Sequence, residues 1–135
     1  MLEGHCECRK VSFQVNGEMN QLSHCHCSQC RRIHGAAYGS YACVLKSEFQ
    51  YLTGSNEVKN YASSADLTRV FCLHCGSNIM AIIKTEPTQL YLAMGLINGE
   101  PIIPDDHHHI YVGSKANWHS ITDDLPQYDE DTVEV

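Results

Sequence analysis

The 135-residue sequence predicts a mainly β fold, with antiparallel β-sheets joined by short helical turns. Short segments in which apolar and polar residues alternate recur along the chain, which is the pattern of half-buried strands. Turn-forming residues such as Thr53-Gly54-Ser55-Asn56 and Asn98-Gly99 separate these segments. Because 43% of the residues are apolar, the chain can bury one core, and we expect a single domain over residues 1–135.

The strands are expected in a regular succession. The first lies within residues 9–16, where Val11, Phe13 and Val15 share one face. The others are expected at residues 38–45, 49–52, 58–61, 68–72, 78–83, 89–94 and 108–112. In the run His107-His108-His109, the two-residue period of a strand places alternate rings on opposite sides of the sheet.

Two helical turns are expected between these strands. One runs from Cys27 to His34, and the other lies near residues 114–118. Residues from about 123 to the end are rich in Asp and Glu, which predicts an acidic C-terminal tail.

The charge and hydropathy of the chain limit its partners. Acidic residues outnumber basic ones by 16 to 9, giving a formal net charge of −7 that repels polyanions, so we expect no nucleic-acid partner. No apolar run approaches the roughly 18 residues that a membrane span requires, and we expect no membrane partner. The first residues lack the features of a signal peptide, which predicts a reducing, cytoplasmic location.

Seven of the eight cysteines are clustered, which in a reducing compartment predicts metal ligands before disulfides. The clusters are a CxC, a CxCxxC and a CxxC, formed by Cys6 and Cys8; Cys25, Cys27 and Cys30; and Cys72 and Cys75. In the last of these, Gly76 can adopt the positive φ that a tight metal-binding loop needs. Cys43 stands alone in a strand-like segment, where we expect it to be a buried core residue.

Zinc takes four tetrahedral ligands, and two of the clusters supply four together. We call this set the four-cysteine cluster: Cys6, Cys8, Cys72 and Cys75. It predicts a closed, structural zinc site. The remaining three-cysteine cluster, Cys25, Cys27 and Cys30, leaves one coordination position open, as in catalytic zinc sites. Two zinc ions per chain are therefore expected.

Several alternatives remain open for the three-cysteine cluster. Cys43, His24, His26 or His34 could supply a fourth ligand, which would make the second site structural as well. A disulfide pair or a thioredoxin-like redox site is also possible from the spacing, although the βαβ context of such a site is missing.

Four segments carry a family resemblance that extends nearly from end to end. They are Gly4-His5-Cys6-Glu7-Cys8, Cys25-His26-Cys27-Ser28-Gln29-Cys30-Arg31-Arg32, Phe71-Cys72-Leu73-His74-Cys75-Gly76-Ser77 and His109-Ile110-Tyr111-Val112-Gly113-Ser114-Lys115. With these segments the chain resembles the glutathione-dependent formaldehyde-activating enzyme (GFA, or centromere-protein-V-like) family, which has the Mss4-like fold. The second segment, with the pattern CHCxxCRR, is specific to the family. The CxxCGS of the third segment is not, because it occurs in many kinds of zinc ribbon.

The resemblance implies a structural zinc on the four-cysteine cluster and a second zinc, near a glutathione site, on the three-cysteine cluster. It implies a carbon–sulfur lyase-type activity, that of an S-(hydroxymethyl)glutathione synthase, which condenses the glutathione thiol with formaldehyde or a related aldehyde. The three-cysteine cluster would be the catalytic centre. A noncatalytic zinc-binding scaffold that binds proteins is the alternative function.

Polar residues around the three-cysteine cluster are candidates for substrate binding. Arg31 and Arg32 could each grip a glutathione carboxylate, with a structural ion pair as the alternative. Ser28 could hydrogen-bond to a sulfur or to the ligand, but we favour its capping the turn after Cys27.

Three histidines near the cluster are candidates for proton transfer. His24, His26 or His34 could pass a proton to the new hydroxymethyl oxygen. A surface or supporting role is the alternative for each of them.

Overall fold

The computed structural model describes residues 1–131, and these residues form two β-sheets, one α-helix and three 3-10 helices. The smaller sheet has the order β1-β2-β5 and contains β1 (Leu2–His5), β2 (Ser12–Val15) and β5 (Phe49–Thr53). The larger sheet has the order β10-β3-β4-β9-β8-β7-β6. Its strands are β10 (His107–Ile110), β3 (Gln21–Cys25), β4 (Gly39–Leu45), β9 (Gln89–Ala93), β8 (Asn78–Ile83), β7 (Leu67–Cys72) and β6 (Val58–Ala62).

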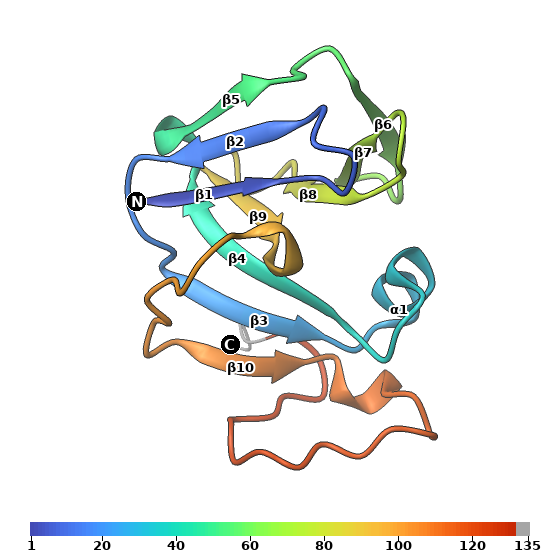
Figure 1. The fold of residues 1–135 in the computed structure, drawn as a ribbon. Helices are drawn as coiled ribbons and strands as arrows, with labels where there is room; N and C mark the ends of the chain where they lie inside the picture. Colours follow the sequence, from blue (N-terminus) through green and yellow to red (C-terminus); the bar gives the residue numbers. More distant parts are fainter. Residues whose placement is uncertain (132–135) are drawn as a thin grey trace.

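The two sheets pack as layers, with β1 and β2 lying across the larger sheet (Figure 1). Neighbouring strands are antiparallel, apart from the parallel pair of β10 and β3. The predicted mainly β fold with antiparallel sheets is confirmed. Among the described residues, no helix has the length and apolar character needed to cross a bilayer.

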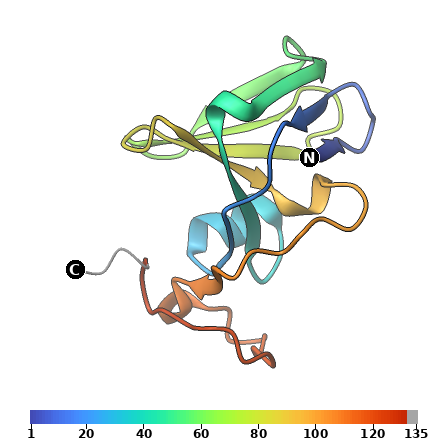
Figure 2. The same ribbon diagram turned by 90° about the vertical axis from the view of Figure 1, so that its left-hand side faces the viewer.

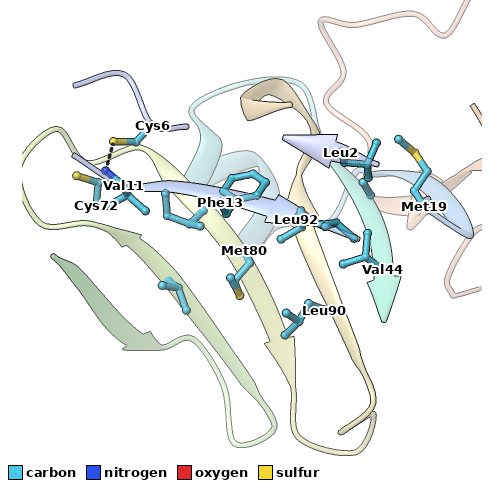
Figure 3. Packing of buried hydrophobic residues seen from close by; sticks show 14 of the residues in the cluster. Leu2, Cys6, Val11, Phe13, Met19, Val44, Cys72, Met80, Leu90 and Leu92 are labelled. Carbon is cyan, nitrogen blue, oxygen red and sulfur yellow. Dashed lines mark hydrogen bonds between the residues drawn. The ribbon is translucent and has the colours of Figure 1, made fainter. Parts of the chain in front are cut away.

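The main core lies between the two layers. Phe13 of β2 is fully buried, and Figure 3 shows it beside Met80 and Leu92 of the larger sheet. As the alternating pattern predicted, Val11 and Val15 are buried on the same side as Phe13. Full burial of one such side chain contributes about 1.5–3 kcal/mol, so this shared face holds the layers together.

Alternation gives the larger sheet two different faces. On β4, Ala42 and Val44 belong to the main core, whereas Tyr41 belongs to a second cluster with Cys25 and Cys30. Successive side chains of a strand point to opposite sides, so each strand contributes to the core with one set of residues and to the opposite face with the other.

The helix α1 (Ser28–His34) confirms the helical turn predicted from Cys27 to His34. Its N-cap residue is Cys27 rather than Ser28, because the Cys27 Sγ accepts a hydrogen bond from the Cys30 backbone N–H at 3.3 Å. The 3-10 helices are η1 (Lys46–Glu48), η2 (Met94–Leu96) and η3 (Val112–Ser114). The turn expected near 114–118 thus begins earlier, with a 3-10 helix at 112–114 and a turn at 117–118.

Two strands, β1 and β3, were missed by the sequence analysis. In β3 the adjacent residues Leu22 and Ser23 are both buried, so the strand lacks the polar alternation of a half-exposed segment. The strand β1 has four residues and includes Gly4, a residue depleted in strands.

The C-terminal segment runs alongside β10. The His109 N–H donates to the Pro126 carbonyl at 2.9 Å, and the Tyr128 N–H donates to the His109 carbonyl at 3.0 Å. Figure 2 shows the segment, coloured orange to red, beneath the sheets. The division into one domain with an acidic tail from about residue 123 stays a prediction, and residues 132–135 lie outside the described residues.

Cys43 is the cysteine that belongs to neither cluster. Its side chain is 2% exposed, which agrees with the core position expected for it, and its thiol donates to the Gln89 Oε1 at 3.1 Å. Burial raises the pKa of this thiol from 9.0 to about 11.

We predict that Cys43 resists alkylation in the folded protein. At pH 8 the raised pKa leaves about 100-fold less thiolate than in the unfolded chain, so iodoacetamide should modify Cys43 at least about 100-fold more slowly. Mass spectrometry of the Cys43 peptide measures the rate in native and urea-unfolded protein. Equal rates would show that the side chain is not buried.

Gly54 offers a test of the junction between β5 and the loop after β1. Its φ is 77°, and a Cβ there would meet the Lys10 carbonyl oxygen and lie 2.9 Å from the Val11 Cα. Gly99 has a similar φ of 73° but open space around it. Gly54→Ala should therefore lower the free energy of unfolding by about 1–3 kcal/mol more than Gly99→Ala, because it adds a backbone clash to the same strain.

Urea unfolding of the two variants measures this difference. Equal losses of stability would contradict the close approach of residue 54 to residues 10 and 11.

Candidate metal centres and their cavity

The four-cysteine cluster joins the loop after β1 to the end of β7 and the turn that follows it. Its four Sγ atoms all lie within 4.8 Å of one another. The Cys6 and Cys8 sulfurs are 3.6 Å apart, and the Cys8 and Cys72 sulfurs are 3.7 Å apart. Tetrahedral ligands about 2.3 Å from a zinc ion lie about 3.8 Å from one another. The arrangement therefore fits a closed tetrahedral metal site.

Backbone groups hold the sulfurs of this cluster in place. The Val11 N–H donates to the Cys6 Sγ at 3.4 Å, the contact dashed in Figure 3, and the His74 N–H donates to the Cys72 Sγ at 3.4 Å. Gly76 has the predicted positive φ, 77°, and its N–H donates to the Cys72 carbonyl at 3.0 Å. These contacts shape the loop that follows Cys72 and hold the sulfurs of the cluster in place.

The three-cysteine cluster forms where β3 passes into α1. Cys25 is the last residue of β3, Cys27 caps α1, and Cys30 lies in its first turn. The three Sγ atoms lie within 4.8 Å of one another. Within residues 1–131, no fourth Cys, His, Asp or Glu ligand atom completes this group. The donor set fits a metal ion with one position left for another ligand.

The three thiols of this cluster influence one another's ionisation. Hydrogen bonds from Cys25 and Cys30 lower the pKa of Cys27, while the bond to Cys27 raises the pKa of Cys25. The three sulfurs therefore differ in how readily they lose a proton. Metal binding at this cluster should therefore release protons.

A cavity of about 630 Å³ lies over the face of the larger sheet that is turned away from the main core, and all three cysteines of the cluster line it. Its other lining side chains include three tyrosines and two carboxylates: Tyr41, Tyr91, Tyr111, Glu86 and Asp131. Its volume lies within the range of small-molecule sites, about 300–1,000 Å³. The three-cysteine cluster is accordingly open to a small ligand.

Of the three predicted substrate-binding residues, only one lines the cavity. Ser28 lines the cavity, whereas Arg31 and Arg32 are not among its lining residues. Arg32 is exposed. The Arg31 Nε is buried and has no hydrogen-bond partner among the described residues.

Arg69, which the sequence analysis missed, is the arginine that lines the cavity. It lies in β7, is 4% exposed, and donates from Nη2 to the Cys30 Sγ at 3.6 Å. The Tyr41 hydroxyl also donates to this sulfur, at 3.7 Å. Arg69 lies three residues before Cys72, which belongs to the four-cysteine cluster. Only the pairing of β7 in the sheet shows that Arg69 faces the three-cysteine cluster instead.

Tyr111 is a second lining residue that the sequence analysis missed. Its φ is 55°, which is uncommon for a residue other than glycine, and its N–H donates to the Glu130 carbonyl at 2.9 Å. Burial, followed by the charges of Asp131, Cys25 and Cys27, raises the pKa of its hydroxyl. The hydroxyl therefore stays protonated near the cluster.

The candidate histidines lie outside the cavity. His24 bonds to Ser40 and His107, with its Nε2 2.8 Å from the His107 Nε2. The His26 Nε2 is 2.8 Å from the His109 Nδ1. His24, His26 and His34 are absent from the cavity lining, so none is placed for direct proton transfer to a ligand there.

His108 is the histidine that lines the cavity. In the parallel pairing of β10 with β3, His109 lies opposite His24, and their ring centroids are 4.9 Å apart. His107 and His109 therefore face His24 and His26, while His108 faces the cavity. The predicted alternation of the three rings is confirmed.

Known proteins share both the sequence and the architecture. The model of a family described as glutathione-dependent formaldehyde-activating enzyme matches residues 1–114. An uncharacterized lyase of Schizosaccharomyces pombe is 31% identical over 77 residues, which cover 57% of this chain and 54% of the relative, so the match spans about half the length of that relative.

A crystal structure of a Rhodobacter sphaeroides protein has the same fold. It superposes with a TM-score of 0.61 and 19% identity, and the match covers 76% of this chain and 97% of the other. The family match extends through both cysteine clusters and most of the residues that line the cavity. The chain therefore belongs to the glutathione-dependent formaldehyde-activating enzyme family.

Proposed function

We propose that this chain is a zinc-dependent carbon–sulfur lyase-type enzyme that condenses glutathione with formaldehyde or a related aldehyde in a reducing, cytoplasmic setting. One observation carries the proposal. Three sulfurs with no fourth protein ligand among residues 1–131 open onto a cavity of about 630 Å³. Family membership and the lyase name of the yeast relative support the reaction class.

The donor set supports zinc at both clusters, because thiolates are preferred ligands of this ion. A zinc ion on the three-cysteine cluster would supply a Lewis acid that favours the thiolate form of an incoming thiol. Cys25, Cys27 and Cys30 would hold that ion at the cavity wall.

In the proposed reaction, the thiol sulfur bonds to the carbonyl carbon, the C=O π bond breaks, and the thiol proton ends on the new hydroxyl oxygen. The protein has to orient the two reactants and carry the proton. We assign the proton transfer to Tyr111, because it lines the cavity and because burial and the nearby charges of Asp131, Cys25 and Cys27 raise the pKa of its hydroxyl.

The carboxylates of glutathione need cationic or polar partners. Ser28 lines the cavity, where its hydroxyl can donate to a carboxylate. We propose Ser28, Arg31 and Arg32 for this role. Neither arginine lines the cavity. Each would therefore contact a terminal carboxylate of glutathione that extends away from the three-cysteine cluster.

A noncatalytic scaffold is the second candidate function. Ile102 and Trp118 are each 69% exposed, and exposed large apolar side chains favour contact with another protein. This function does not require an open metal position.

We predict two zinc ions per purified chain. A chelator should remove the ion of the three-cysteine cluster first, because three protein ligands hold it less tightly than four. Metal analysis by mass spectrometry measures the content before and after chelation. Cys27→Ala should retain one ion, and a single ion in the wild-type chain would reject the two-site model.

The activity itself is tested by NMR exchange between free glutathione and S-hydroxymethylglutathione in the presence of formaldehyde. Because the uncatalysed reaction is spontaneous, the rate with zinc-loaded wild-type protein is compared with that of Cys27→Ala. We expect wild-type protein to accelerate exchange, and Cys27→Ala to reduce exchange to the uncatalysed rate. Tyr111→Phe should lower the rate while keeping both ions.

Cys43→Ala is the matched control, because it removes a cysteine that belongs to neither cluster. It should exchange at the wild-type rate. Equal exchange by wild-type protein and Cys27→Ala would reject the enzyme and leave the scaffold.

A further inference from the structure

Arg69 is a buried cation without a carboxylate partner among residues 1–131. Its side chain is 4% exposed, and no Asp or Glu of residues 1–131 forms a salt bridge with it. A buried charge is strongly destabilising unless an opposite charge and hydrogen bonds compensate it. The structure must therefore supply an anion of another kind next to this guanidinium.

The guanidinium donors converge on the three-cysteine cluster. Nη2 donates to the Cys30 Sγ at 3.6 Å, and Nη1 donates at 2.9 Å to the Tyr41 hydroxyl, which itself donates to the same sulfur at 3.7 Å. The third donor, Nε, is bonded to the Ser63 Oγ at 3.1 Å. Cys30 thus receives two side-chain hydrogen bonds, one of them from a full positive charge.

We propose that Arg69 is the counter-charge of the three-cysteine cluster, a positioning residue that donates to the Cys30 sulfur and sets the affinity of the cluster for a metal dication. The proposal rests on the proposed function, in which this cluster binds a metal. Three thiolates and one dication carry a net charge of −1, which the guanidinium balances in a buried setting.

The four-cysteine cluster provides a contrast within the same chain. Four thiolates and a dication carry a charge of −2, yet no buried Lys or Arg side chain donates to these sulfurs among the described residues. Cys8 is exposed and Cys75 is half-buried, so water can solvate this charge. The three-cysteine cluster has no exposed member and therefore needs a counter-charge from the protein.

The strand β7 explains how one segment serves both clusters. Arg69 and Cys72 are three residues apart, so the strand alternation sends them to opposite faces of the sheet. Cys72 belongs to the main core and the four-cysteine cluster, whereas Arg69 faces the cavity. The hydrogen bond from Arg69 to Ser63, and that from Ser63 to Gln29 at 3.2 Å, also connect the end of β6 to α1.

The test is cobalt binding by the full chain, followed through the thiolate-to-cobalt and d–d absorption bands during competition with a chelator. The spectrum of Cys27→Ala gives the signal of the four-cysteine cluster alone. For Arg69→Gln, we expect the affinity of the three-cysteine cluster to fall about 10–100-fold, the usual cost of losing a partner of a metal ligand. In Arg69→Lys, which keeps the positive charge but loses the several N–H donors of the guanidinium, the affinity of this cluster should fall less.

Each variant contains its own folding control, because the affinity of the four-cysteine cluster should not change. Lys59→Gln is the matched charge control: it removes one cation from an exposed position of the neighbouring strand β6 and should leave both affinities at wild-type values. An unchanged three-cysteine affinity in Arg69→Gln, or an equal loss at both clusters, would overturn the proposal.

The proposed function fails in a different way. If the wild-type chain binds cobalt only at the four-cysteine cluster, the metal site itself is absent. If the wild-type chain fills both clusters and Arg69→Gln does too with equal affinity, only the role of Arg69 is rejected.

Discussion

The two-residue period of the larger sheet is the constraint on which the rest of the structure depends. One set of side chains packs against the smaller sheet, and the alternate set forms the wall of a cavity. On β4 this rule places Val44 in the core and Tyr41 beside Cys30. A shift of one residue in register would exchange the two faces and destroy both at once.

The sequence predicts the parts of the fold that repeat a local pattern. The strand with Phe13, the helical turn after Cys27 and the alternation of His107 to His109 all follow from periods of two or from turn chemistry, and the structure contains each of them. The strand β3 was missed because it is buried on both faces, so its sequence has no clear alternation. The three-cysteine cluster was predicted because its ligands are close in sequence, and the four-cysteine cluster was predicted because its two distant pairs together supply the four ligands that zinc takes.

The wall of the cavity could not be predicted in the same way. Arg31 and Arg32 adjoin the three-cysteine cluster in sequence but do not line the cavity, whereas Arg69 lines it from a strand 39 residues beyond Cys30. The histidines show the same limit. His24 and His26 flank Cys25, but the pleat sends them to the opposite face, where burial lowers the pKa of each to about 4. Neighbours in sequence are therefore poor guides to neighbours in a sheet.

The two clusters differ in how far apart their cysteines lie in the sequence, and this difference affects the order in which the clusters can form. Cys25 to Cys30 is one short continuous segment, whereas Cys8 and Cys72 are 64 residues apart. The entropy of loop closure grows with the logarithm of loop length, so bringing the distant pair together costs about 2 kcal/mol more. As the chain emerges from the ribosome, the three-cysteine cluster can gather its ligands while the strand that carries Cys72 has not yet been synthesised. The three-cysteine cluster can therefore form before the four-cysteine cluster.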